Sequence, residues 1–258
     1  MSDKAVIENN FSKSAYRYDE HAAIQRFVAG RLIEELPDNR FDSILEIGCG
    51  TGVYTCFLNM RFKHSNIKAL DISEKMVEIA REKIRTKNVV FEIGDAEKIP
   101  VAEEYDLITS NSTFHWFESI ENALLKYSGI LNKGGWFVFS VFGPSTFAEL
   151  AASLRKIVKE KDISVASSDF LEKEKLARLL TKFFTQVSIK ELLVEREYPS
   201  TTDLLKEIKY TGTQGCAARG DFIWTHGLLD RLEDVYRNDN KGRIIATYQI
   251  FLCKARSR

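Results

Sequence analysis

Three glycines at alternate positions follow an acid near residue 50. The stretch Ile44–Gly52 reads ILEIGCGTG, in which Glu46 precedes Gly48, Gly50 and Gly52. Glycine lets the backbone turn tightly and leaves no side chain where a ligand would lie. A carboxylate at the end of an apolar strand is costly to bury without a partner, so we expect Glu46 to face a polar ligand. The pattern favours the binding of a nucleotide-like ligand at a turn between a strand and a helix.

The spacing of the glycines separates the families that share such a turn. In the dinucleotide pattern G-x-G-x-x-G the third glycine would fall at Val53, and the P-loop pattern requires a lysine that does not follow here. The remaining pattern, E-x-G-x-G-x-G, resembles motif I of the class I S-adenosylmethionine (SAM) dependent methyltransferases. A nicotinamide-dependent oxidoreductase is disfavoured.

Two further acids end later predicted strands. Asp71 ends the strand 66–71, 23 positions after Gly48, where a carboxylate accepts hydrogen bonds from both ribose hydroxyls of a nucleoside. A helix-capping role is the alternative for Asp71. The strand 89–96 closes with Asp95 and Ala96. In the methyltransferase pattern this acid accepts the adenine amino group, and Ala96 supplies a backbone N–H.

The segment after the fourth strand is where a methyl acceptor would meet the sulfonium. The strand 105–111 ends at Asn111, and Ser112, His115 and Trp116 follow. We expect Asn111, Ser112 and His115 to position the acceptor and Trp116 to line the methyl-transfer pocket. For His115 the alternative is a loop residue without chemistry.

These side chains require alternating strands and helices to hold them in place. A helical segment is expected before the first strand, at 5–36, and another just after the glycine turn, at 54–61. Further helices are expected at 123–131, 147–161, 170–184, 204–210 and 228–236, and later strands at 136–142, 186–197 and 244–254.

The fold class that follows is α/β: a doubly wound, seven-stranded, mostly parallel sheet whose final strand is antiparallel. We expect a single domain over residues 1–258, with an N-terminal helical flap at 1–37. A helical insertion at 144–184 is expected to form a lid over the acceptor, because insertions above the carboxyl edge of such a sheet usually build that pocket.

Composition narrows the classes of partner. Lys plus Arg and Asp plus Glu both total 37, so no global charge attracts nucleic acid or an anionic membrane. The absence of a long apolar run and of a signal-like start predicts a cytoplasmic protein with no membrane partner. The four cysteines lack metal-ligand spacing, so no metal site is expected.

With these pieces placed, the chain resembles the malonyl-[acyl-carrier-protein] O-methyltransferases of biotin synthesis over nearly its full length. Beyond the SAM motifs, the resemblance rests on three stretches: F-x(6)-Y-x-x-H-A-x-x-Q over Phe11–Gln25, GPSTFAEL over Gly143–Leu150, and IKYTG over Ile208–Gly212. It implies methyl transfer from SAM to the free carboxylate of a malonyl thioester, carried on acyl carrier protein or coenzyme A.

The motifs and the resemblance together predict a set of site residues, in which the resemblance implies that Tyr18 contacts SAM. Those expected to bind SAM are Tyr18, Gln25, Glu46, Gly48, Cys49, Gly50, Asp71, Ile72, Met76, Asp95, Ala96 and Asn111. Those expected to act in methyl transfer are Tyr18, Asn111, Ser112, His115 and Trp116.

The expected chemistry needs few catalytic groups. A malonyl carboxylate is already ionised at neutral pH, so transfer depends on proximity, orientation and exclusion of water, and aromatic faces can stabilise the sulfonium. Two alternatives remain open. One is a class I methyltransferase of another small carboxylate or of a quinone precursor, and the other is a SAM-binding protein without catalysis.

Basic residues of the 144–184 insertion suggest where an acidic carrier protein would dock. Their alternation with acids makes an ordinary solvated helix face an equally good interpretation. The residues are Lys156, Lys159, Lys173, Lys175, Arg178 and Lys182.

Overall fold

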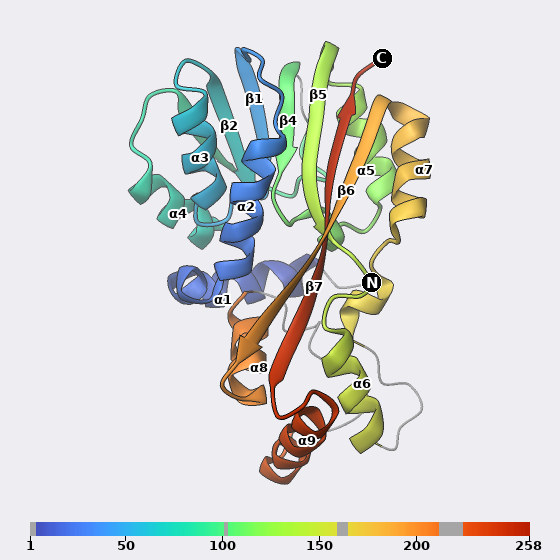
Figure 1. Ribbon diagram of the computed structural model, residues 1–258. Coiled ribbons are helices and arrows are strands. Elements are labelled where there is room, and N and C mark those ends of the chain that lie inside the picture. Colours follow the sequence, from blue (N-terminus) through green and yellow to red (C-terminus); the bar gives the residue numbers. More distant parts are fainter. Residues whose placement is uncertain (1–3, 101–102, 159–164, 212–223) are drawn as a thin grey trace.

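A single sheet of seven strands organises the chain, which the computed structural model describes over residues 4–100, 103–158, 165–211 and 224–258 (Figure 1). The strands lie in the order β3-β2-β1-β4-β5-β7-β6. Their bounds are β1 Ser43–Ile47, β2 Asn66–Asp71, β3 Val89–Ile93, β4 Tyr105–Ser110, β5 Leu131–Phe142, β6 Thr185–Tyr198 and β7 Ile244–Arg256. Pairing from β3 to β5 is parallel, and β7 is antiparallel to both β5 and β6. The predicted doubly wound sheet with an antiparallel final strand is confirmed.

Helices cover both faces of this sheet. Helices α2, α3 and α4 lie on one face, and α5 and α7 on the other (Figure 1). The helices are α1 Lys4–His21, α2 Ala23–Glu35, α3 Val53–Arg61, α4 Glu74–Lys83, α5 Ile120–Ser128, α6 Ala148–Ile157, α7 Lys173–Phe183, α8 Thr201–Tyr210 and α9 His226–Asp239, with short 3₁₀ turns η1 Phe114–Trp116 and η2 Ala166–Asp169. The central strands β1, β4 and β5 bury side chains on both faces, as a sheet between two helical layers requires, whereas the edge strand β3 leaves Val90 exposed.

Local capping sets several of these boundaries. Ser73 accepts a hydrogen bond from the Met76 amide and begins α4. The helix expected at 123–131 begins earlier, at Ile120, because the Ser119 hydroxyl accepts a hydrogen bond from the amide of Asn122. That helix ends at Ser128. The strand expected at 136–142 begins earlier, at Leu131.

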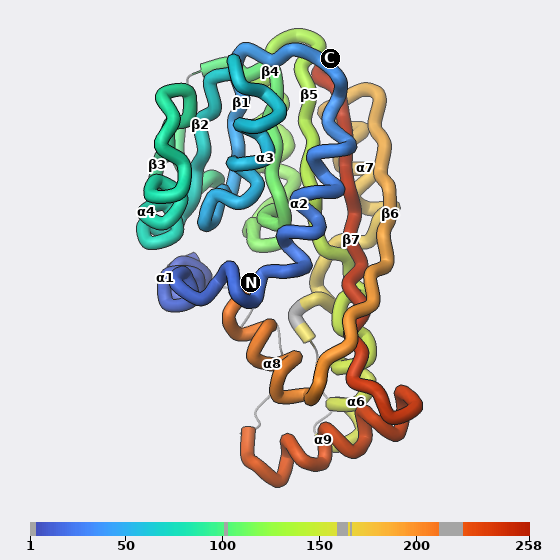
Figure 2. Tube along the Cα trace, turned by 60° about the vertical axis from the view of Figure 1, so that its left-hand side comes forward, coloured from blue at the N-terminus to red at the C-terminus, as the bar shows by residue number. Residues whose placement is uncertain are grey.

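The antiparallel strands β6 and β7 continue beyond the carboxyl ends of the parallel strands, and this part of the two strands is called the extension below. Helices α6, α8 and α9 pack around this extension, and α1 lies crosswise between it and the parallel strands (Figures 1 and 2). Within the 144–184 insertion, α6 contacts α9 and β7, whereas α7 contacts α5 and β6 on the sheet face. The described part of the insertion therefore divides between two places, and its role as a lid stays a prediction.

Of the described residues, no helix is long and apolar enough to cross a membrane.

Candidate active site

The glycine turn forms the floor of a cavity at the carboxyl ends of β1, β2 and β4. Gly48, Gly50 and Gly52 have φ of +73°, +53° and +84°, values that residues with a side chain rarely adopt. A Cβ atom on Gly48 would lie 2.1 Å from Oγ1 of Thr113, so that position admits only glycine. The Gly48 amide donates to the carbonyl of Leu70 at 2.7 Å, which ties the turn to the end of β2. Backbone, not side chain, therefore faces the cavity along the turn.

Asp71 stands beside that turn at the tip of β2. Its Oδ2 accepts from the Gly50 amide at 2.8 Å, and its Oδ1 accepts from the Ser73 amide at 2.9 Å. Burial raises the pKa of Asp71, while these backbone donors lower it. A carboxylate oxygen has two acceptor sites, so each oxygen keeps one for a ligand hydroxyl. Asp71 does not cap α4, whose cap is Ser73, and it lines the cavity, so its contact with ribose stays a prediction.

Asp95 provides a second carboxylate after β3. Its Oδ1 accepts from the Glu97 amide at 3.0 Å, and the Lys4 ammonium lies 3.5 Å away. Its Oδ2 is buried and accepts no hydrogen bond from the described residues, although the exposed Lys98 ammonium lies 3.7 Å away. A buried oxygen that accepts no hydrogen bond is uncommon, so Oδ2 can serve as the acceptor for an amino group.

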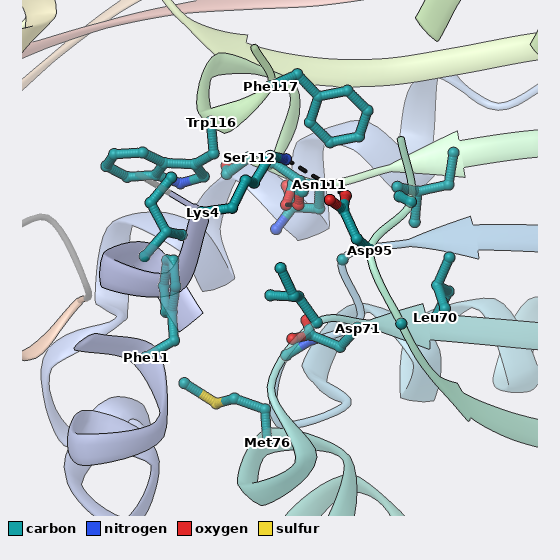
Figure 3. Close-up of a pocket in the computed structure, with 18 of the residues that line it drawn as sticks. Lys4, Phe11, Leu70, Asp71, Met76, Asp95, Asn111, Ser112, Trp116 and Phe117 are labelled. Carbon is teal, nitrogen blue, oxygen red and sulfur yellow. Dashed lines mark hydrogen bonds and ion pairs between the residues drawn. The ribbon is translucent and has the colours of Figure 1, made fainter. Parts of the chain in front are cut away.

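Helix α1 covers the open side of the cavity with aromatic side chains (Figure 3). Phe11 meets Trp116 edge to face, with ring centroids 6.0 Å apart, and Tyr18 lies 6.3 Å from Phe11. Burial raises the pKa of the Tyr18 hydroxyl above its ordinary value, so Tyr18 stays neutral. Phe11 and Trp116 form an apolar wall across the cavity from Asp95 (Figure 3).

Most of the predicted residues meet in this first cavity. It encloses about 680 Å³ with the open mouth included. The predicted residues that line it are Tyr18, Gly48, Gly50, Asp71, Ile72, Met76, Asp95, Ala96, Asn111, Ser112 and Trp116.

Glu46 and Cys49 do not line the first cavity, contrary to expectation. Glu46 is fully buried, and neither carboxylate oxygen has a hydrogen-bond partner. Burial raises the pKa of Glu46 to about 8, which the facing Thr55 hydroxyl offsets only in part. Burial likewise raises the pKa of the Cys49 thiol, so no thiolate forms near neutral pH.

Gln25 and His115 line a second cavity instead. This second cavity encloses about 410 Å³, mouth included, and lies among α2, η1, α8 and the segments after β5 and α6. Its walls are Gln25, His115, Phe142, Thr146, Phe147, Ser167, Phe170, Glu207, Ile208, Thr211 and Tyr248. Burial lowers the pKa of His115 to about 3, so this imidazole is neutral and a poor base.

Lys4, Thr113 and Phe117 also line the first cavity and were not predicted. The Lys4 ammonium pairs with Glu97 at 2.6 Å and lies 4.7 Å from the centroid of the Phe117 ring. Only the docking of α1 brings Lys4 here, and nothing in the local sequence indicates it. Thr113 could have been anticipated, because a glycine at position 48 indicates that a residue from a neighbouring strand end lies close to it.

Similarity to other proteins identifies the family. Residues 45–139 match the family described as methyltransferase domain. A malonyl-[acyl-carrier protein] O-methyltransferase 2 of Ilyobacter polytropus is 36% identical over 241 residues, which cover 93% of this chain and 92% of that protein. The chain belongs to the malonyl-[acyl-carrier protein] O-methyltransferase family. Another member, from Halalkalibacterium halodurans, is 34% identical over 98% of this chain and 99% of its own.

Solved structures agree on the fold of this family member. The YcgJ protein of Bacillus subtilis aligns with a TM-score of 0.62 and 16% identity, covering 90% of this chain and 98% of its own. A phosphoethanolamine N-methyltransferase 2 of Haemonchus contortus, solved with S-adenosyl-L-methionine, aligns with a TM-score of 0.54 and 14% identity over 90% of this chain and 52% of its own. At such identities the likeness shows the methyltransferase fold alone.

Proposed function

We propose that this chain transfers a methyl group from SAM to the free carboxylate of a malonyl thioester, carried on acyl carrier protein or coenzyme A. Family membership over nearly the whole chain supports the substrate class. The observation that carries the proposal is the burial of His115 against the rings of Phe142 and Phe170, which leaves this imidazole a poor base. Burial lowers its pKa to about 3. An acceptor that is already ionised, such as a carboxylate, needs no base.

The residues of the first cavity fit a nucleoside. Asp71 offers acceptor sites for two ribose hydroxyls. Oδ2 of Asp95, which accepts no hydrogen bond from the described residues, fits the adenine amino group. Gly48 and Gly50 leave room for the ligand along the turn. When bound, SAM supplies an activated methyl group on a sulfonium.

The chain contributes position and surroundings to the transfer. Tyr18, Phe11 and Trp116 present aromatic rings, whose faces attract a cation such as a sulfonium. The carboxylate oxygen of the acceptor forms the new bond to the methyl carbon as its bond to sulfur breaks, so opposite charges cancel and no proton moves. Asn111 and Ser112 lie at the tip of β4, where they can orient the acceptor. Exclusion of water by α1 strengthens the attraction between the two charges.

A carrier protein as partner rests on the family resemblance and not on a visible basic surface. Three of the six basic residues considered for docking pair with acids of this chain: Lys156 with Asp239, Lys173 with Glu191, and Lys182 with Glu121. Lys159 lies outside the described residues. The docking surface stays a prediction.

The test is transfer of labelled methyl from SAM to malonyl-carrier protein, with succinyl- and acetyl-carrier proteins measured beside it. We expect label in the malonyl ester and none with acetyl, which lacks the carboxylate. Intact SAM binding without transfer to malonyl would contradict the acceptor and leave another carboxylate, a quinone precursor or a non-catalytic role.

A further inference from the structure

The second cavity shares a wall with the first. Asn111 lines the first cavity and donates through Nδ2 to the backbone carbonyl of Gln25 at 3.0 Å, while Gln25 lines the second. The consecutive residues His115 and Trp116 face the second and the first cavity in turn. A group in the second cavity would therefore lie next to the end of the first cavity formed by Asn111 and Trp116.

Two polar atoms of the second cavity lack partners. Oε1 of Gln25 and Nδ1 of His115 are buried without a hydrogen bond. The ring of His115 is held by aromatic neighbours, with Phe170 at 5.0 Å and Phe142 at 5.2 Å between centroids. Buried polar atoms in such surroundings cost free energy unless something binds them. Because a half-turn of the last torsion of glutamine exchanges its oxygen and nitrogen, Gln25 can present a donor at the same place.

Three other polar side chains that line the second cavity already have partners within the protein. Ser167 donates its hydroxyl to the carbonyl of Thr146, and Thr146 donates its own to the carbonyl of Gln249 at 3.2 Å. Glu207 is paired with Arg196 at 2.6 Å and also accepts from the Tyr198 hydroxyl at 2.8 Å. No lysine or arginine is among the described residues that line the second cavity.

Three stretches on which the family resemblance rests contribute to the same cavity. Gln25 ends the first of these stretches, Phe147 belongs to GPSTFAEL, and Ile208 belongs to IKYTG. They come from widely separated parts of the chain, and within the first stretch Phe11 and Tyr18 line the first cavity whereas Gln25 lines the second. A shared role on the acceptor side explains why these three stretches converge.

We propose that the second cavity receives the acyl end of the acceptor, with the Gln25 amide and the His115 imidazole donating hydrogen bonds to its carboxylate. This inference rests on the proposed function and moves Gln25 from the cofactor to the acceptor. Neutral donors orient the carboxylate without neutralising it. A cationic partner would withdraw electron density from the attacking oxygen, so the absence of lysine and arginine from the described walls suits a nucleophile.

The test compares Gln25→Glu and Gln25→Leu with wild type, using Gln186→Glu and Gln186→Leu at an exposed site as matched controls. Gln25→Glu places a negative charge against the acceptor, so kcat/KM for malonyl-carrier protein should fall about 100-fold or more. Gln25→Leu removes donors to a charged group, so the fall should be about 10- to 100-fold. The Kd of S-adenosylhomocysteine, measured by calorimetry, should stay within about threefold of wild type, because Gln25 lies outside the first cavity.

A second readout does not depend on turnover. Binding of malonyl-carrier protein to the enzyme saturated with S-adenosylhomocysteine should weaken in both Gln25 variants, and binding of acetyl-carrier protein should not change. If these variants do not fold by near-UV circular dichroism, His115→Phe keeps the aromatic packing and removes the ring nitrogens. It should lower kcat/KM at least about tenfold with the Kd of S-adenosylhomocysteine unchanged.

Two results would overturn the inference. Unchanged kcat/KM in the folded variants would mean that the second cavity does not hold the acceptor. A loss of S-adenosylhomocysteine affinity equal to the loss in kcat/KM would return Gln25 to the cofactor. Wild-type enzyme that fails to methylate malonyl-carrier protein would instead contradict the proposed function, so the two failures are distinct.

Discussion

Glu46 is an acidic residue in fully buried surroundings. It lies in the middle of the sheet, paired across to Ala69 and Thr109, with none of its surface exposed. A charged carboxylate there would lack the solvation that its charge requires. Because burial raises the pKa of Glu46 to about 8, the folded protein keeps this carboxyl protonated near neutral pH.

This protonation makes stability depend on pH. Between about pH 4.5 and pH 8 the folded state holds a proton that the unfolded state releases, so the free energy of unfolding falls as pH rises and levels off above pH 8. Glu46→Gln keeps the shape and removes the titration. Its Tm should lie close to wild type near pH 5 and exceed it by about 10 °C at pH 8. Raising a pKa from 4.5 to about 8 is worth about 4–5 kcal/mol, and 1 kcal/mol shifts Tm by roughly 2–4 °C in a protein of this size.

The exposed residue Glu34 serves as the control for Glu46. Glu34→Gln should change Tm by the same small amount at every pH, because the Glu34 side chain is 60% exposed. Scanning calorimetry in buffers from pH 5 to pH 8.5 measures both variants. A difference between Glu46→Gln and wild type that does not grow with pH would show that Glu46 is ionised in the folded protein.

At the scale of elements, α1 forms the outer wall of the first cavity and is held at several points. Near its middle the Ser12 hydroxyl meets that of Ser73 at 2.8 Å. Near its end Asp19 accepts from Thr51 at 2.5 Å and pairs with Lys83 of α4. These contacts tie α1 to α4 and to the glycine turn, which are the parts of the fold that carry the expected SAM ligands.

Releasing α1 should weaken cofactor binding without touching the nucleoside contacts. The double variant Ser12→Ala/Asp19→Ala removes one contact near the middle of the helix and two near its end, and we expect the Kd of SAM to rise about tenfold. Faster hydrogen exchange over residues 4–21 should accompany the weaker binding. Arg31→Ala, which removes an exposed ion pair on α2, should change neither quantity. An unchanged Kd beside faster exchange would mean that α1 covers the cavity without helping to bind SAM.

Sequence reasoning succeeded where a side chain's place follows from its own strand or turn. Asp71 and Asp95 end β2 and β3, and the glycine turn fixes Gly48, so local pattern placed all three in the first cavity. It failed where packing between distant elements decides. Lys4 reaches the first cavity only through the docking of α1, and Gln25 faces the second because the chain changes direction at Ala22, between α1 and α2.

One of the two buried apolar clusters of the described residues continues from the parallel strands into the extension of β6 and β7. Val28 of α2, Leu150 of α6 and Leu232 of α9 belong to the same buried apolar cluster, although the last two lie on the extension. Strand β7 pairs along its length with β6 and joins that extension to β5. Elements that share a core and a sheet are expected to unfold together, and the single domain over residues 1–258 stays a prediction.

One cooperative unfolding transition is therefore expected. Near-UV and far-UV circular dichroism should report the same Tm, and SAM at about 100 times its Kd should raise that whole transition by roughly 5–10 °C, since such binding adds about 2.7 kcal/mol. Leu232→Ala, which leaves a cavity far from the SAM pocket, should cost about 2–5 kcal/mol and lower the same single transition. Two transitions, of which SAM shifts only one, would mean that the extension of β6 and β7 and its helices unfold separately from the rest of the fold. The second cavity, whose walls come from the extension and from the rest of the fold, would then open before the first cavity unfolds.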